Sequence, residues 1–437
     1  MKKTTFSLVF LLISTIGTFA AGTWQSLNLT KTAGGTISTN INMMALDGGR
    51  LYVATSDGIW VSPSANGGDF EPYGLQGVIV SHLNFKVLKL AVVTITASDD
   101  ATKTCNKLYK HNGSNWVITN FNPTSVSTFG GPAANFDQIQ DGANNTVIIV
   151  PTWGNGMWRS TDGGTSFTQY AYGTNADGAV YKTVTGIWAY GNKLYGTDKT
   201  TGSAQYLLTS LDYGATWTNV FAGNFFNPRA FHTRKFNAID FLYMGGDSDN
   251  GAKGSLDFSE DAGANWTGSF SVGSDFWFTN KIIGDDNGPL YISCSKSNVM
   301  VSMDNGETFA PLGTGIGIIA SPPKYFLSDL VKSATKLYVS TRTLNGIYVY
   351  DLTNSAVNTL KTNTLSMYLD PAQNELFVKT QAGARVSIYS VTGMLLQSVV
   401  APNANPSINV KDLNASVYMV KVVSADGKLF TGRFVKN

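Results

Sequence analysis

Four octets with the same pattern recur along this chain of 437 residues. They read STDGGTSF, SLDYGATW, SEDAGANW and SMDNGETF, and they begin at residues 160, 210, 259 and 302. Each has Ser at its first position, Asp at its third, Gly at its fifth and an aromatic residue at its eighth. A repeat at intervals of 43 to 50 residues restricts the fold to supersecondary units that stack on one another.

The residue types of the octets are those of a structural turn. Ser and Asp side chains can bond the backbone of their own turn, and Gly adopts backbone conformations that other residues resist. A catalytic interpretation would require equivalent active sites on several separate units, so we assign the octets a structural role. The residues concerned are Ser160, Asp162, Gly164, Phe167, Ser210, Asp212, Gly214, Trp217, Ser259, Asp261, Gly263, Trp266, Ser302, Asp304, Gly306 and Phe309.

Short alternating segments precede the octets. RLYVATSDGIWVS (50–62) and KLYVSTRTLNGIYVY (336–350) each contain two apolar runs separated by a polar loop, and similar segments occur throughout residues 145–294. Alternation interrupted by Gly, Asn and Asp predicts β-hairpins. Charged residues amount to only 14%, whereas aromatic residues reach 12% and glycines number 45, which favours an all-β protein rich in turns.

The repeating unit is therefore three strands, an octet turn and a fourth strand, which predicts a β-propeller. An aromatic residue opens each outer strand, and seven such residues occur: Trp24, Phe70, Trp116, Phe167, Trp217, Trp266 and Phe309. The last unit has three strands without an octet, whereas residues 23–29 look like an outer strand without its inner ones. We expect this N-terminal strand to close the last blade of a seven-bladed propeller over residues 22–352.

The octet pattern resembles the Asp-box, or BNR, repeat of sialidases and related propellers. This resemblance implies the architecture and says little about activity, because unrelated functions share the fold. Sialidases also have an early Arg-Ile-Pro motif and a Tyr nucleophile paired with a Glu. This sequence has no Arg-Ile-Pro, and Glu71, Glu260 and Glu307 lie in or beside octet turns. We therefore do not expect sialidase activity.

Both ends of the chain carry export signals. A basic start, a short apolar run and small residues at 20–22 predict a secretory signal peptide over residues 1–21, and no other segment is expected to span a membrane. After a linker at 353–362, residues 363–437 are predicted to form a small β-sandwich. Its order of strands, with Tyr389, Gly393, Leu413 and Lys436, resembles the type A C-terminal sorting domain of the type IX secretion system in Bacteroidetes. The resemblance implies passage across the outer membrane and the secretion machinery as a partner.

Charge and cysteine content exclude other classes. The formal net charge is +2, and the main body has no basic stripe, so no nucleic-acid partner is expected. The two cysteines, Cys105 and Cys294, could pair in an exported protein, and the sequence leaves this open. No cofactor is expected. No metal site is expected either, because His82, His111 and His232 lie in different units without ligand spacing.

The ligand site is predicted on the face of the propeller opposite the octet turns. Loops between second and third strands and between blades would build its mouth. The candidate ligand-binding residues are Asp57, Asp99, Trp153, Asn155, Asp198, Lys199, Arg229, Asp247, Trp277 and Arg342.

We therefore expect an exported, cell-surface or secreted protein that binds a glycan or an extracellular protein without catalysis. Aromatic faces with a few polar groups suit such recognition. One alternative is a secreted glycoside hydrolase that uses a pair of aspartates in the mouth, although no catalytic residue can be singled out. Another alternative is a scaffold for surface protein assembly.

Overall fold

The computed structural model describes most of the chain after residue 21. The described residues are 22–27, 29–31, 34, 36–37, 40–65, 67–94, 107–121, 135–152, 156–170, 184–199, 205–223, 226–236, 239–247, 255–271, 279–294, 299–303, 305–306, 309–316, 327–341, 346–353, 363–370, 374–390, 395–424 and 429–436. Within these ranges the structure contains β-strands and no helices, which confirms the all-β prediction. The predicted signal peptide at 1–21 lies outside them. The chain divides into two compact units, Ala21–Asn354 and one that contains Ser355–Asn437.

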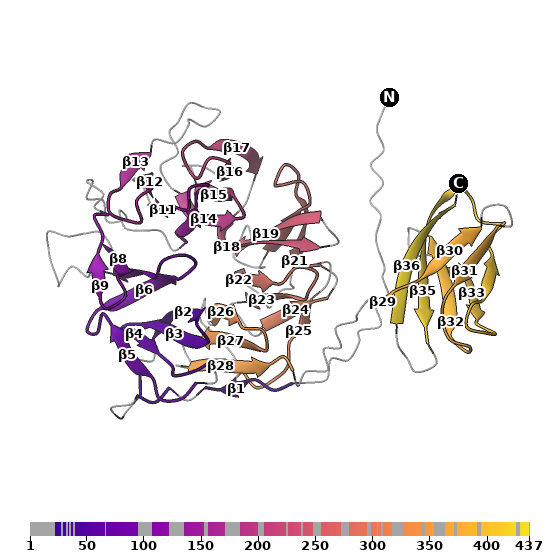
Figure 1. Ribbon diagram of the computed structural model, residues 1–437, viewed down its shortest axis with the longest axis horizontal. Helices are drawn as coiled ribbons and strands as arrows, with labels where there is room; N and C mark the ends of the chain where they lie inside the picture. Colours follow the sequence, from indigo (N-terminus) through magenta and orange to yellow (C-terminus); the bar gives the residue numbers. More distant parts are fainter. Residues whose placement is uncertain are drawn as a thin grey trace. The chain divides into compact units, whose positions relative to one another are not determined.

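The first unit consists, in its described part, of seven four-stranded antiparallel sheets arranged as a ring (Figure 1). We call them blades 1 to 7. Blade 1 contains β2 (Ile41–Asp47), β3 (Arg50–Thr55), β4 (Gly58–Val61) and β5 (Glu71–Gly74). Blade 2 contains β6 (Ile79–Asn84), β7 (Leu90–Thr94), β8 (Lys107–His111) and β9 (Trp116–Ile118). Blade 3 contains β10 (Asp137–Gln140), β11 (Thr146–Pro151), β12 (Met157–Ser160) and β13 (Thr168–Tyr170).

Blades 4 to 7 continue the same order. They are β14 (Val184–Tyr190), β15 (Lys193–Lys199), β16 (Gln205–Ser210) and β17 (Thr218–Gly223); β18 (Phe226–Phe236), β19 (Ile239–Asp247), β20 (Ser255–Ser259) and β21 (Thr267–Ser271); β22 (Thr279–Gly284), β23 (Leu290–Cys294), β24 (Val299–Ser302) and β25 (Ala310–Pro311); and β26 (Leu327–Lys332), β27 (Lys336–Thr341), β28 (Gly346–Asp351) and β1 (Gln25–Ser26). The first strand of each blade is the innermost (Figure 1).

The N-terminal strand closes the ring, as the sequence predicted. In β1, Gln25 lies opposite Val349 of β28, and Leu27 donates its N–H to the carbonyl of Ile347 at 2.7 Å. Trp24 lies just before β1 and donates its indole N–H to the carbonyl of Leu312 at 2.6 Å. Strand β1 therefore completes blade 7, and Trp24 holds it against the end of blade 6.

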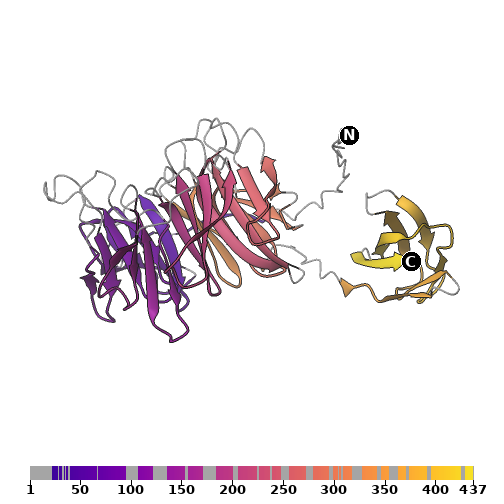
Figure 2. The ribbon, with the colours of Figure 1, turned by 90° about the horizontal axis from the view of Figure 1, so that it is seen from above.

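Apolar side chains fill the spaces between blades. Leu51 and Val53 of β3 and Trp60 of β4 pack toward blade 7, whereas Tyr52 and Ala54 of β3 pack toward blade 2. A blade has a neighbour on each side, so its second strand is buried on both faces and reads as a continuous apolar run. The core of the propeller is consequently a series of apolar layers between blades. Figure 2 shows the ribbon of these blades from above.

The second unit is a small β-sandwich, as predicted. One sheet has the order β29 (Asn363–Thr364), β36 (Leu429–Lys436), β35 (Ser416–Val423), β32 (Arg385–Ser390) and β33 (Leu395–Val400). The other has β30 (Met367–Asp370), β31 (Glu375–Val378) and β34 (Ser407–Asn409). Leu376 and Ile408 from the smaller sheet and Val386, Ile388 and Val420 from the larger one form a shared buried core.

Candidate functional site

The meander of each blade defines two faces of the propeller. Connections between strands one and two and between strands three and four lie on one face, which we call the hairpin face. Connections between strands two and three and between successive blades lie on the other, the loop face. The octets occupy three-to-four turns and so belong to the hairpin face. The sequence predicted the ligand residues on the loop face.

Each described octet closes on itself through its Ser and Asp side chains. In blade 4, Ser210 Oγ accepts the N–H of Gly214 at 2.8 Å and donates to Asp212 Oδ1 at 2.8 Å. Asp212 then accepts the backbone N–H of Thr216 at 2.8 Å and its hydroxyl at 2.6 Å. Blades 3 and 5 repeat this arrangement, and in blade 6 Gly306 donates to Ser302 Oγ at 2.7 Å. Asp304 lies outside the described residues.

These bonds affect the octet carboxylates directly. Burial opposes the ionisation of Asp162, but hydrogen bonds from the hydroxyl and N–H of Ser166 outweigh it and lower the pKa of Asp162 to about 2. A carboxylate that is held as an acceptor in this way is a poor base and a poor proton donor near neutral pH. The octets thus have the geometry of a turn.

The octet glycine also brings the turn close to the preceding blade. Gly214 has φ of 79°, and a Cβ there would lie 2.6 Å from Ile149 Cδ1 of blade 3. Gly263 has φ of 92°, and its Cβ would lie 2.7 Å from Leu207 Cδ2 of blade 4. Backbone conformation and close packing therefore both require Gly at this position.

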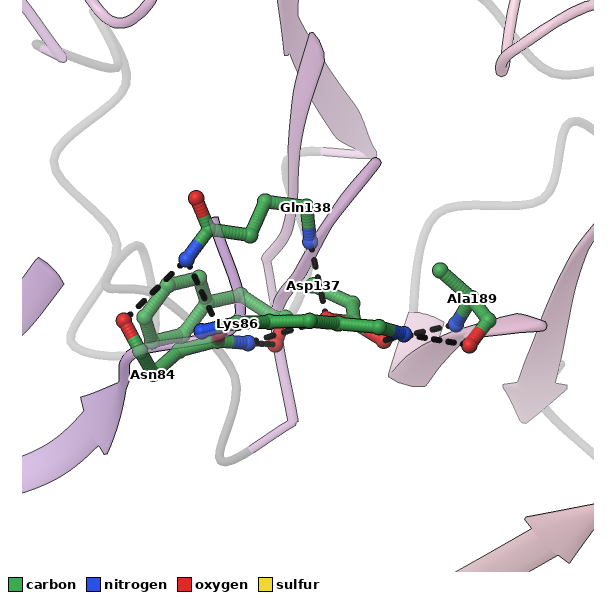
Figure 3. Close-up of polar contacts among 6 residues, drawn as sticks. Asn84, Lys86, Asp137, Gln138 and Ala189 are labelled. Carbon is green, nitrogen blue, oxygen red and sulfur yellow. Dashed lines mark hydrogen bonds and ion pairs between the residues drawn. The ribbon is translucent and has the colours of Figure 1, made fainter. Parts of the chain in front are cut away.

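A polar cluster joins the first strands of blades 2, 3 and 4 (Figure 3). Asp137 of β10 is its centre. Its Oδ1 accepts the N–H of Gln138 at 2.8 Å and Asn84 Nδ2 at 3.0 Å, and its Oδ2 accepts the N–H of Ala189 at 2.6 Å and Lys86 Nζ at 3.2 Å. One carboxylate thus bonds the innermost strands of both neighbouring blades.

Gln138 completes this cluster on the side of blade 2. Its Nε2 donates to Asn84 Oδ1 at 2.9 Å and to the carbonyl of Leu88 at 2.7 Å, while its Oε1 accepts the N–H of Leu88 at 2.8 Å. The amide of Gln138 therefore binds the strand-one to strand-two turn of blade 2 as a backbone strand would.

Blade 7 has an equivalent acidic residue. Asp329 lies three residues before the end of β26, as Asp137 does in β10. Its Oδ2 accepts the N–H of Met44 from the next blade at 2.8 Å, and Lys281 of the preceding blade lies 3.7 Å from its Oδ1. Burial raises the pKa of Asp329, against the opposing effect of Lys281. At two places in the ring, an aspartate of a first strand therefore links three consecutive blades.

Bulges in the first strands provide further links between blades. Asn42 and Asn280 each lie at a register shift, and their amides donate to the carbonyls of Val80 and Leu327 in the next blade at 2.7 and 2.6 Å. A bulge turns one side chain out of the ladder and so makes it available to the neighbouring strand.

These clusters can bind a ligand more readily than they can catalyse a reaction. The Asp137 carboxylate has four donors, so its lone pairs are already used. Lys86 donates to Asp137 and to the carbonyl of Ala189, and its side chain is 46% exposed. One of its three N–H donors thus remains for a ligand carbonyl or carboxylate near the hairpin end of the ring.

Of the predicted ligand residues, only Asp57 has a described side chain. It lies in the turn between β3 and β4, where its Oδ1 accepts the N–H of Gly77 at 2.9 Å and its Oδ2 lies 4.0 Å from Lys31 Nζ. Lys31 in turn lies 4.5 Å from the centre of the Trp60 ring. Asp57 therefore stabilises the connection between blades 1 and 2 on the loop face, while remaining partly exposed.

The other predicted residues are described by their backbone or not at all. Asp198 and Lys199 end β15, Asp247 ends β19, and Arg229 lies at a register shift of β18. These positions share the loop face with Asp57. Asp99, Trp153, Asn155, Trp277 and Arg342 lie outside the described residues.

Metal sites and membrane-spanning helices can be searched for only in the described part of the chain. There, no group of His, Cys, Asp and Glu residues could hold a metal ion, and no helix is long and apolar enough to cross a membrane. Cys294 is a free, buried thiol whose pKa is raised by burial, and Cys105 lies outside the described residues. Burial lowers the pKa of His232 to about 4, so this histidine is neutral at physiological pH.

Sequence reasoning missed the residues that join the blades. Arg234 is another example, because its side chain is 1% exposed and donates to Asn305 Oδ1 at 2.7 Å and to the carbonyl of Gly288 at 2.6 Å in blade 6. A signal existed, since Asp137, Lys281 and Arg234 are charged residues within the innermost strands of their blades, and a buried charge needs a partner. The partners were not evident, because they belong to other blades.

Comparisons with known proteins agree with this division of the chain. Residues 366–437 match the family described as "Secretion system C-terminal sorting domain". A xyloglucanase of Hypocrea jecorina (strain QM6a) is 25% identical over 303 residues, which cover 61% of this chain and 36% of that protein. The chain thus spans about a third of the length of this curated relative.

Two solved structures share the fold. The GH74 enzyme of Niastella koreensis has a TM-score of 0.51 at 18% identity, covering 93% of this chain and 67% of its own. YCF48 bound to the D1 peptide has a TM-score of 0.50 at 13% identity, covering 77% of this chain and 97% of its own. The chain is therefore a β-propeller followed by the sorting domain of the type IX secretion system, which supports export to the cell surface or the medium.

Proposed function

We propose that this exported propeller is a binding protein that recognises a glycan or an extracellular protein through its loop face, without catalysis. Residues 1–21 would direct the first export step and 353–362 would link the propeller to the sorting domain. The loop face carries the candidate residues Asp57, Asp198, Asp247 and Arg229 at turns or strand ends, where side chains vary without disturbing the blades.

The observation that carries this proposal is the structural engagement of the described acidic side chains. A glycoside hydrolase needs two carboxyl groups across a cleft, one of them protonated near neutral pH. In the described part of the propeller, burial raises the pKa of Asp257 and Asp329. Asp329 bonds Met44 and Lys281, and Asp257 lies in a third strand between blades. Both carboxyl groups thus belong to strands that pack between blades and not to the turns of the loop face.

Size also favours binding. YCF48 is matched over 97% of its length and is a propeller of comparable extent that was solved with a bound peptide. The two carbohydrate enzymes are longer than this chain, which covers 36% of one and 67% of the other. A propeller of comparable extent can thus bind a peptide, which supports binding as the proposed function.

Hydrolysis of a glucan is the second candidate, because the sequence similarity to a xyloglucanase extends over 303 residues. We propose to separate the two by incubating the purified full chain with xyloglucan and measuring both retention in an affinity gel and release of reducing ends. Retention without release supports binding, whereas release proportional to protein concentration would establish an enzyme.

A glycan array and a pull-down from the culture medium would identify the ligand class. Trp153→Ala and Trp277→Ala, at positions that the sequence predicts on the loop face, are expected to weaken binding. Leu211→Ala serves as the matched control, since Leu211 is 64% exposed on the hairpin face. Equal loss in the control would contradict a loop-face site. Binding of a surface protein with no glycan would favour the scaffold role.

A further inference from the structure

The outward face of the five-stranded sheet in the sorting domain carries exposed apolar side chains. Val400 and Val435 are each 55% exposed, Met419 is 44% exposed and Val417 is 37% exposed. Val420, which follows Met419 in β35, belongs instead to the buried core. Successive residues of a strand point to opposite sides of the sheet, so the exposed set faces away from the core.

The strand register places these side chains next to one another. Val417 of β35 lies opposite Val435 of β36. In the next outward row, Met419 lies between Arg433 of β36 and Tyr389 of β32. Side chains directly opposite each other on one face are in contact range, so Val417, Val435, Met419 and Tyr389 form one continuous patch with Arg433 at its edge.

Three cations surround this apolar patch. Beyond Met419, Lys421 lies opposite Ser387, and Arg385 lies opposite Val400 in the following row. Arg433 and Arg385 are exposed, and no ion pair with a described carboxylate is found for these three side chains. The face therefore has an apolar centre with a positive rim.

The described acidic residues of the domain lie elsewhere. None of the five strands of this sheet contains Asp or Glu, whereas Asp370 and Glu375 belong to the smaller sheet and Asp412 to a turn; Asp426 lies outside the described residues. The charged side chains of these five strands are thus all positive, so a complementary partner surface is negative.

The side chains favour a protein over a membrane as partner. Membrane-binding surfaces insert Trp, Phe or Leu among their cations. Here the apolar set is Val and Met on a flat sheet, and the described aromatic on this face, Tyr389, is half-buried. A rigid apolar centre with a polar rim is the usual composition of a protein interface.

We propose that the outward face of β36, β35, β32 and β33 is the surface by which the sorting domain binds an acidic, partly apolar protein surface of the type IX export machinery. This inference rests on the identity of the sorting domain and is independent of the ligand of the propeller.

Crosslinking in cells tests the contact. A photoreactive amino acid replaces Met419 in the full chain, which is expressed in a bacterium with type IX secretion. We expect a crosslink to a protein of the export machinery. The control position is Tyr368, which is 63% exposed on the smaller sheet and is expected to give no such product. The same product from both positions, or a product at Met419 that contains only lipopolysaccharide or the propeller, would overturn the proposal.

Charge reversal tests the electrostatic part. Lys421→Glu combined with Arg433→Glu is expected to lower surface delivery of the full chain by about tenfold or more, with accumulation in the periplasm. Lys379→Glu is the control, because Lys379 is exposed beyond the end of β31 in the smaller sheet. Arg433→Gln is expected to give an intermediate defect and guards against misfolding. Normal delivery of the doubly reversed chain, or equal loss in the control, would refute the assignment.

Discussion

Replacing Asp257 with Asn is expected to stabilise the propeller, by an amount that grows as the pH rises above about 4 and is constant at neutral and alkaline pH. Asp257 lies in β20 opposite Met244 of β19. Met244 packs among Tyr195, Leu207 and Phe231 at the boundary between blades 4 and 5. Directly opposite residues share a face, so Asp257 points into this apolar layer. Burial alone raises its pKa from 3.8 to about 6.

The direction of the pH effect follows from these two values. Below pH 3.8 the carboxyl is protonated in both the folded and the unfolded chain, and ionisation has no cost. Between pH 3.8 and about 6 the unfolded chain ionises this carboxyl while the folded chain keeps it protonated, so the stability of the wild type falls over this interval and is constant above it. A gap of about 2 pKa units corresponds to roughly 3 kcal/mol, and partial hydration reduces this to about 1–3 kcal/mol. Asn removes that penalty because it does not ionise.

Tryptophan fluorescence makes the measurement specific for the propeller. All nine tryptophans lie between Trp24 and Trp277, so urea denaturation of the full chain followed by fluorescence reports this unit alone. The stability difference between Asp257→Asn and wild type is expected to be flat below pH 4 and to grow up to about pH 7. Asp240→Asn is the control, since Asp240 is exposed on the adjacent strand.

A gain that is constant across the pH range would refute the reasoning. It would mean that the amide stabilises the fold by a new hydrogen bond and that the carboxyl at Asp257 is not the source of strain. A loss of stability above pH 7 would show instead that the ionised carboxylate has a favourable partner in the folded propeller.

Four further outcomes follow from the same structure. Ser210→Ala removes the acceptor of the Gly214 N–H and is expected to lower the stability of the propeller by about 1–3 kcal/mol, measured by the same fluorescence assay. Arg234→Met removes the donor to the carbonyl of Gly288 and one of the donors to Asn305 Oδ1, and it is expected to destabilise by more than ~2 kcal/mol; an unchanged midpoint would contradict this. Deleting residues 22–27 exposes the edge of β28, and size-exclusion chromatography is expected to show oligomers that the intact chain does not form. Asp162 has a lowered pKa of about 2, so its contribution is present above pH 3.8 and is lost as the pH falls toward 2; Asp162→Asn is expected to flatten that part of the acid denaturation curve.

The residues of the octet turns have mainly local roles. Ser210, Asp212 and Gly214 bond one another within a turn of eight residues, and each aromatic residue counted in the sequence lies directly before an outer strand or begins it. Such contacts connect neighbours in the chain, so a periodic pattern is sufficient to detect them. Closure by β1 was also predictable, because the strand missing from blade 7 could be matched to an unpaired strand at the N-terminus.

The ligand site was less accessible to this reasoning. Residues such as Asp57 were selected because they occupy loops, and a loop aspartate bonds its own or a neighbouring turn more often than it contacts a ligand. The contact between Asp57 and Gly77 follows that rule, although it joins two blades and therefore also depends on the fold.

The sequence by itself determined the class of fold, the repeat, the closure of the ring and the sorting domain, because each of these depends on local turn chemistry, on alternation or on the order of elements along the chain. Only the tertiary structure decided the polar links between blades. Asp137 and Ala189 are 52 residues apart, and Met44 and Asp329 are 285 apart. Pairs so distant meet only after the ring has closed, and no local pattern in the sequence records which inward polar residue will face which backbone N–H.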